Sequence, residues 1–234
     1  MQDTRPTAGE CLRPFSLREL LLSRESIVLL SGLAFLLLEW HHRHFGLLPP
    51  RESLFEWHIS TVACLFVAPV IVCVFFLDAG PKEFGLQAGD DRVAVRYLGL
   101  YAAVVVPVIV VASRFPAFQQ YYPMYAMAKH DVSAWTLSVA SYAVYFFAWE
   151  FFFRGYLLFG LAKRFGAWAI LIQTVPFTLV HLGKPEAEVF SAMVAGVALG
   201  VMAYRSRTMV PCFLLHWFCA MLMDALVIFW PAHR

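Results

Sequence analysis

Two charged residues four positions apart interrupt a long apolar stretch of the chain. Glu150 and Arg154 stand in the segment Trp149-Glu-Phe-Phe-Phe-Arg-Gly155. Residues at i and i+4 of an α-helix share one face, about 40° apart around the axis, so the carboxylate and the guanidinium can pair. Ionisable groups at bilayer depth are costly and usually face a bundle interior or a wet cavity. We therefore predict that this pair marks the centre of function.

Other polar side chains interrupt the apolar segments that follow, among them His181 and His216. A lone histidine in a membrane helix often only bonds a carbonyl of a neighbouring helix, and this structural interpretation stays open for each one. Glu150, His181 and His216 fall on three different predicted helices. Counted at about 1.5 Å per residue, they lie roughly 12 to 20 Å from the predicted cytosolic ends. We predict that they converge near mid-membrane.

One carboxylate with two imidazoles supports two kinds of hydrolytic chemistry. Without metal, the carboxylate and one histidine activate a water molecule as general base, while the other histidine donates to the oxyanion. With metal, the three groups form a zinc site with an open fourth position. The sequence contains neither GxSxG nor HExxH, so serine catalysis and a zincin are less supported.

The composition is that of a polytopic membrane protein. Of the 234 residues, 61% are hydrophobic and 16% aromatic, which excludes a soluble domain of ordinary composition. The net charge is only +2 and the basic residues are scattered, so we predict no nucleic-acid partner. The five cysteines form no CxxC pair, which indicates neither a disulfide framework nor a zinc ribbon.

Hydropathy predicts an all-α membrane helix bundle of about seven transmembrane helices, with six to eight as the range, since each span needs about 20 apolar residues. Residues 1–25 form a predicted cytosolic N-terminal arm, and 26–234 a single transmembrane helical domain. The predicted spans cover residues 27–40, 57–77, 97–112, 135–164, 167–182, 187–204 and 209–230. With the N-terminus inside, eleven of the 18 Lys and Arg residues face the cytosol and six face outward. This bias favours a cytosolic N-terminus.

Three short segments between about residues 140 and 225 carry a family resemblance. They are Glu150-Phe-Phe-Phe-Arg154-Gly155, Phe177-Thr-Leu-Val-His181 and Pro211-Cys-Phe-Leu-Leu-His216, with Gly196 and Gly200 between the last two. In order and spacing they resemble the signature segments of the CPBP family, the CAAX proteases and bacteriocin-processing enzymes, also called the Abi family.

This resemblance implies a glutamate-dependent intramembrane endopeptidase that needs no cofactor. In the family pattern of EExxxR, FxxxH and HxxxN, the first Glu and the FxxxH histidine activate water, and the last His and Asn stabilise the oxyanion. Carried over, His181 activates water, His216 holds the oxyanion and Phe177 packs beside the site. We predict that Glu150 activates water together with His181, with Arg154 in support. The implied partners are the lipid bilayer and a membrane-associated protein or peptide substrate, and we expect a bacterial inner membrane.

Two positions depart from the family pattern. Trp149 stands where the family has its first Glu, and Ala220 stands where it has its Asn. Tryptophan accepts no proton, so Glu150 must take the base role or the chain is not a protease of the usual kind. Asp224, one turn beyond Ala220, is a candidate replacement for the missing oxyanion donor.

Three other functions remain open from the sequence. A catalytically silent membrane scaffold or immunity-type protein agrees with both departures. A metalloprotease variant would use Glu150, His181 and His216 as ligands. A transporter ranks last, because neither inverted repeats nor paired broken helices are evident. Among substrates, a prenylated CAAX tail, a bacteriocin leader and a C-terminal sorting segment all fit the resemblance.

Overall fold

The computed structural model describes residues 16–45 and 54–230, and every regular element in these two ranges is helical. Most of the predicted N-terminal arm, residues 1–15, lies outside the described residues. The elements are α1 Leu17–Leu21, α2 Arg24–Phe45, α3 Leu54–Val62, the π-helix η1 Ala63–Val67, α4 Ala68–Phe75, the 3₁₀-helix η2 Pro81–Phe84, α5 Asp91–Ala112, α6 Pro116–Tyr121, the 3₁₀-helix η3 Ala126–Lys129, α7 Val132–Glu150, the π-helix η4 Phe151–Phe159, α8 Gly160–Phe165, α9 Trp168–Leu179, α10 Glu186–Ser206 and α11 Val210–Phe229.

All seven segments predicted as spans are helical, but they are not equally long or apolar. In the described part of the chain, five helices are long and apolar enough to cross a membrane. They are Glu56–Phe75, Asp91–Ala112, Val132–Phe165, Glu186–Ser206 and Val210–Phe229. By length and composition these five helices are suited to span a membrane.

The two other predicted spans differ for separate reasons. The 22-residue α2 contains Arg24, Glu25 and Glu39 and is therefore less apolar than the five. Helix α9 has only 12 residues, about 18 Å at 1.5 Å per residue, which is short of a hydrocarbon core of about 30 Å. It ends at Leu179, soon after Pro176, so His181 lies in the turn that follows and not on a helix as predicted.

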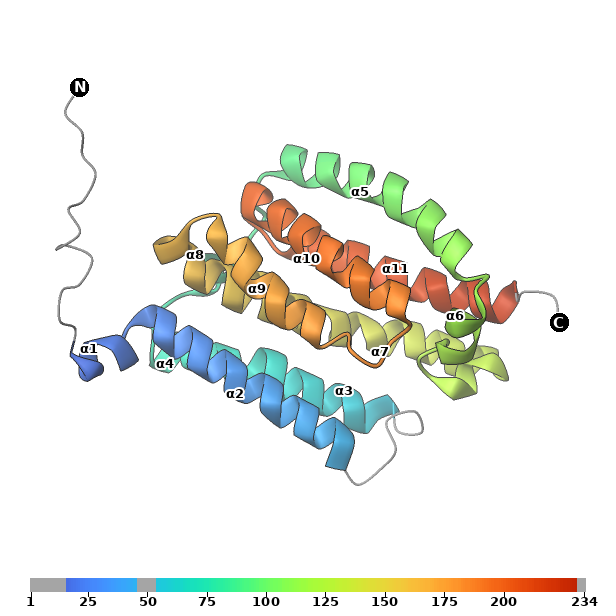
Figure 1. Cartoon of the computed structure of the whole chain (residues 1–234), viewed down its shortest axis with the longest axis horizontal. Helices are drawn as coiled ribbons and strands as arrows, with labels where there is room; N and C mark the ends of the chain where they lie inside the picture. The colour runs from blue at the N-terminus through green and yellow to red at the C-terminus, as the bar shows by residue number, and fades with distance from the viewer. Residues whose placement is uncertain (1–15, 46–53, 231–234) are drawn as a thin grey trace.

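The long helix formed by α7, η4 and α8 is the centre of the bundle. In Figure 1, α2, α3 and α4 lie along one side, α5, α10 and α11 lie along the other, and the long helix and α9 run between them. Within the apolar window of this helix 56% of the residues are buried, compared with 6% for α5. The central helix therefore carries the core, and α5 is a peripheral helix.

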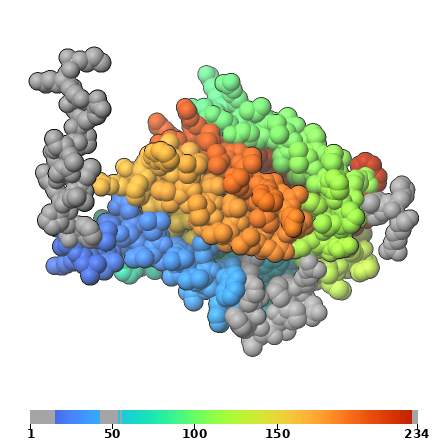
Figure 2. Space-filling view, viewed as in Figure 1, coloured from blue at the N-terminus to red at the C-terminus, as the bar shows by residue number. Residues whose placement is uncertain are grey.

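The outer surfaces of the peripheral helices are apolar. Val104 and Val108 of α5 and Leu33 and Leu37 of α2 are exposed, and these two helices form opposite margins of the space-filling view in Figure 2. Exposed apolar surface on this scale suits contact with lipid rather than with water.

Small residues allow α9 and α10 to approach closely. A Cβ atom at Gly196 would lie 2.8 Å from Thr174 Cγ2, and one at Gly200 would lie 2.8 Å from Ile170 Cγ2. The buried Gln173 Nε2 donates to the Gly196 carbonyl oxygen at 2.9 Å. Gln173, one of the polar residues of the apolar segments, thus joins two helices, as interhelical amides do in membrane bundles.

Candidate functional site

The predicted ion pair between Glu150 and Arg154 is present and fully buried. Arg154 Nη1 donates to Glu150 Oε1 at 2.9 Å, and neither side chain is exposed. The guanidinium carbon of Arg154 lies 4.0 Å from the ring centroid of Phe177, which brings α9 against the pair through a cation–π contact. Arg154 lies in η4, the nine-residue π-helix that begins directly after Glu150. Long π-helical segments are rare and are often found at functional sites.

Glu150 also binds His216 on a different helix. His216 Nδ1 donates to the same oxygen, Glu150 Oε1, at 2.6 Å, and so ties α11 to α7. The other carboxylate oxygen, Oε2, is buried without a hydrogen-bond partner among the described residues. Because Nδ1 is the donor of this bond, the second ring nitrogen of His216, Nε2, is left for other contacts.

His181 is oriented by the backbone of its own segment. Its Nδ1 donates to the Phe177 carbonyl oxygen at 2.7 Å, and the two rings lie 4.8 Å apart. A carbonyl oxygen only accepts hydrogen bonds, so this contact places the proton of the neutral ring on Nδ1 and the lone pair on Nε2. A purely structural role of this histidine, a hydrogen bond to a backbone carbonyl, therefore accounts for only one of its two ring nitrogens.

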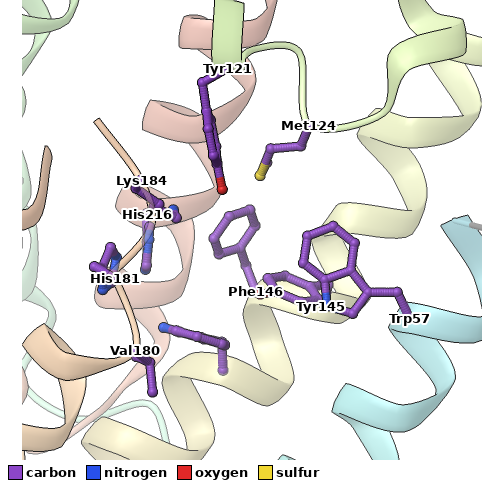
Figure 3. Close-up of a pocket in the computed structure, with 10 residues that line it drawn as sticks. Trp57, Tyr121, Met124, Tyr145, Phe146, Val180, His181, Lys184 and His216 are labelled. Carbon is purple, nitrogen blue, oxygen red and sulfur yellow. The ribbon is translucent and has the colours of Figure 1, made fainter. Parts of the chain in front are cut away.

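The two histidines line one pocket, whose empty space, including the part open to the outside, is about 390 Å³ (Figure 3). It lies between the central helix, the turn after α9, and the segment around α6. The residues that line it are Trp57, Tyr121, Met124, Tyr145, Phe146, Trp149, Val180, His181, Lys184 and His216. Glu150 is not among them. Of the three predicted catalytic side chains, His181 and His216 thus line the pocket, whereas Glu150 only hydrogen-bonds the lining residue His216.

Trp149, which stands at the first Glu of the resembled motif, lines the wall of the pocket. Its indole stacks on Tyr145 with ring centroids 5.6 Å apart and meets the His181 ring edge-on at 6.2 Å. It is 5% exposed, and it lines the pocket while its neighbour Glu150 does not. The adjacent positions in sequence therefore face different surroundings, as the rotation of about 100° per helical residue requires.

Asp224, the candidate replacement for the missing Asn, contacts the segment that leads to the pocket. It is buried on α11 and does not line the pocket, and its Oδ1 accepts a hydrogen bond from the Met124 backbone N–H at 3.2 Å. Met124 does line the pocket. Asp224 therefore holds part of the pocket wall through Met124.

Several lining residues were not predicted from the sequence. Tyr121 and Met124 come from the aromatic-rich segment between α5 and α7, and Trp57 comes from α3. The only signal in the sequence was the aromatic content of these segments, which also fits a membrane interface.

The described residues contain no group of three or more His, Cys, Asp or Glu side chains that could hold a metal ion. One nitrogen of each histidine is committed, in His181 to a carbonyl and in His216 to Glu150. Two imidazole rings beside one small pocket can serve proton transfer.

Residues 131–222 match the family model described as type II CAAX prenyl endopeptidase Rce1-like. This range runs from the start of α7 into α11 and includes Glu150, His181 and His216. No curated protein and no solved structure matches the chain. From α7 into α11 the chain is therefore similar to this family, in agreement with the resemblance of its three motifs to those of the CPBP family.

Proposed function

We propose that the chain is a CAAX-protease-like intramembrane endopeptidase, which hydrolyses a peptide bond in a membrane-anchored or C-terminal substrate segment. The family match supports the class of enzyme. The observation that carries the proposal is the pocket lined by both His181 and His216, which come from two separate segments of that matched region. Two imidazoles beside one cavity can supply the base and the oxyanion donor that peptide hydrolysis needs.

His181 is the proposed general base. Its Nδ1–H is committed to the Phe177 carbonyl, so the Nε2 lone pair is available to a water molecule in the pocket. As the water oxygen attacks the scissile carbonyl carbon, its proton passes to Nε2. The imidazolium then returns this proton to the leaving amine as the carbon–nitrogen bond breaks.

His216 is the proposed oxyanion donor, and it acts in its protonated form. One N–H of the imidazolium then bonds Glu150 Oε1, and the other, at Nε2, is directed to the negatively charged oxygen of the tetrahedral intermediate. Glu150 accepts the N–H at Nδ1 and holds the ring in place, as a buried carboxylate does for the histidine of a catalytic triad.

This assignment changes the role of Glu150 from the one predicted. We expected Glu150 to activate water together with His181. Because its Oε1 accepts two hydrogen bonds and the side chain does not line the pocket, we propose that it is a positioning residue for His216. Arg154 in turn compensates the buried carboxylate, and Phe177 supports both Arg154 and His181.

The test is hydrolysis of a farnesylated CAAX peptide by purified protein in liposomes. His181→Ala and His216→Ala should each lower kcat by about 10²-fold or more while the protein stays folded, as judged by its Tm. Full activity of either variant would remove that histidine from the mechanism. Loss of activity with a chelator, restored by zinc, would instead favour the metalloprotease alternative.

Trp149 in the pocket wall favours a second candidate, the catalytically silent membrane scaffold. This candidate predicts that the wild-type protein hydrolyses no peptide and that both histidine variants keep the biological effect of the chain. Hydrolysis by the wild type that depends on His181 would exclude it.

We also propose that the N-terminus is cytosolic and that the chain resides in a bacterial inner membrane. The proposed orientation is supported by the distribution of Lys and Arg residues. Reporter fusions at the two termini should place the N-terminus inside, and the opposite result would reverse the orientation.

A further inference from the structure

Lys184 is the one Lys, Arg, Asp or Glu side chain among the described residues that line the pocket (Figure 3). The other lining residues are aromatic or apolar, apart from the two histidines. A permanent positive charge in a small, mostly apolar cavity attracts an anionic group more strongly than the same charge in water does.

One hydrogen bond holds the ammonium group of Lys184 in place and leaves its other N–H donors for a ligand. Its Nζ donates to Glu188 Oε1 at 2.7 Å, and the side chain is 24% exposed. An ammonium has three N–H donors, and this bond uses one of them. The carboxylate of Glu188 is itself shared, because its Oε2 accepts from the Tyr122 hydroxyl at 2.7 Å. Glu188 does not line the pocket, so the nearer charge on the pocket side is the ammonium.

The backbone couples Lys184 directly to the proposed general base. Lys184 N–H donates to the His181 carbonyl oxygen at 3.1 Å, within the turn that joins α9 to α10. The two side chains therefore stand three residues apart on one hydrogen-bonded turn and line the same pocket. Any group bound by Lys184 is held a short way from the bond that His181 acts on.

We propose that Lys184 binds the free C-terminal carboxylate of the substrate, so that the enzyme cleaves close to a chain end. This inference rests on the proposed function, since it names the substrate group that the same pocket recognises. A carboxylate is the anionic group at every peptide C-terminus, and it forms short charge-assisted hydrogen bonds with an ammonium. Such a carboxylate site favours substrates that are cleaved near a free C-terminus over a leader that is removed by cleavage far from the chain end.

The probe is one farnesylated CAAX peptide made in two forms, as the free acid and as the C-terminal amide. Wild-type protein should cleave the acid with a kcat/KM about 10- to 100-fold above that of the amide, the usual range for one hydrogen bond to a charged group. In Lys184→Met this ratio should fall to about 1, and Lys184→Arg should keep most of it. Each ratio is measured within one protein, so a partly unfolded variant does not distort it.

Lys163→Met is the matched control, because Lys163 lies on α8, is 61% exposed and binds Glu83 away from the pocket. It should keep the wild-type ratio of acid to amide. An unchanged ratio in Lys184→Met, or equal cleavage of both peptides by the wild type, would overturn the proposal.

A binding measurement separates this inference from the proposed function. Fluorescence anisotropy of the two labelled peptides with His181→Ala protein reports affinity without cleavage. Tighter binding of the acid, lost when Lys184→Met is added, supports the carboxylate site even if no hydrolysis occurs in any protein. Equal affinities for acid and amide would overturn the site, whereas His181-dependent cleavage alone would leave the proposed function standing.

Discussion

Glu150 Oε1 lies 2.6 Å from His216 Nδ1, and this contact joins α7 to α11 across 66 residues of sequence. The same oxygen accepts from Arg154 Nη1 at 2.9 Å. The carboxylate is thus the shared acceptor of a cation within its own helix and an imidazole of another helix. In the proposed mechanism Glu150 therefore supports His216, and neither Glu150 nor Arg154 lines the pocket.

Glu150→Gln should lower kcat by about 10²- to 10³-fold, because His216 loses the negative charge that holds its imidazolium. It should also destabilise the protein by about 3 to 5 kcal/mol, since Arg154 remains as an uncompensated buried charge. The measurements are kcat on the farnesylated peptide and Tm in detergent.

The double variant Glu150→Gln/Arg154→Met is the control that separates the two effects. Removing both charges should recover much of the stability without restoring kcat. Recovery of activity along with stability would show that Glu150 serves the fold only.

Trp149→Glu should raise kcat by about tenfold or more, because it places a carboxylate in the pocket wall beside His181. It should also lower Tm, since the buried indole loses its contacts with Tyr145 and Phe153. Trp149→Gln has nearly the shape of the Glu variant but no charge, and it should lower Tm without raising kcat. An equal rise in both variants would mean that the indole only blocks the pocket.

Asp224→Ala should raise KM more than it lowers kcat, because the Met124 N–H loses its acceptor and the pocket wall becomes less ordered. An unpaired buried N–H costs about 1 to 3 kcal/mol of stability. Asp224→Asn keeps a carbonyl oxygen as acceptor and should behave more like the wild type. A drop in kcat alone for the Ala variant would instead support the oxyanion role that we first expected of Asp224.

Stability at acidic pH should depend on Glu83, which lies in η2 outside the candidate spans. A hydrogen bond from Lys163 lowers the pKa of this carboxyl below its usual 4.5, and Arg24 acts in the same direction. A carboxyl with a lowered pKa stabilises the fold above its unfolded pKa, and this contribution is lost as the pH falls through the folded pKa.

The measurement is Tm in detergent between about pH 5 and pH 3, for the wild type and Glu83→Gln. The Tm of the wild type should fall more steeply, by a small margin because the pair is partly exposed to solvent. Parallel curves for the two proteins would show that the pair adds nothing to stability.

The sequence alone determined the helical segments and the residues that can do chemistry. Each of the seven apolar runs found from hydropathy contains a helix, because apolar runs are a local property, although only five helices of the described residues are long and apolar enough to span a membrane. The spacing of Glu150 and Arg154 predicted their pairing because i and i+4 share a helical face. The three motifs pointed to the family that the match over residues 131–222 supports.

Only the tertiary structure decided how these residues are arranged. Helical periodicity states which residues share a face but not what the face meets, so it left open that Trp149 and not Glu150 lines the pocket. Contacts between residues far apart in sequence depend on the tilt and rotation of packed helices. This packing places Glu150 against His216 and Asp224 against the Met124 N–H, and it brings Lys184 to the pocket. The early end of α9 at Leu179 likewise placed His181 in a turn, where its ring reaches the pocket.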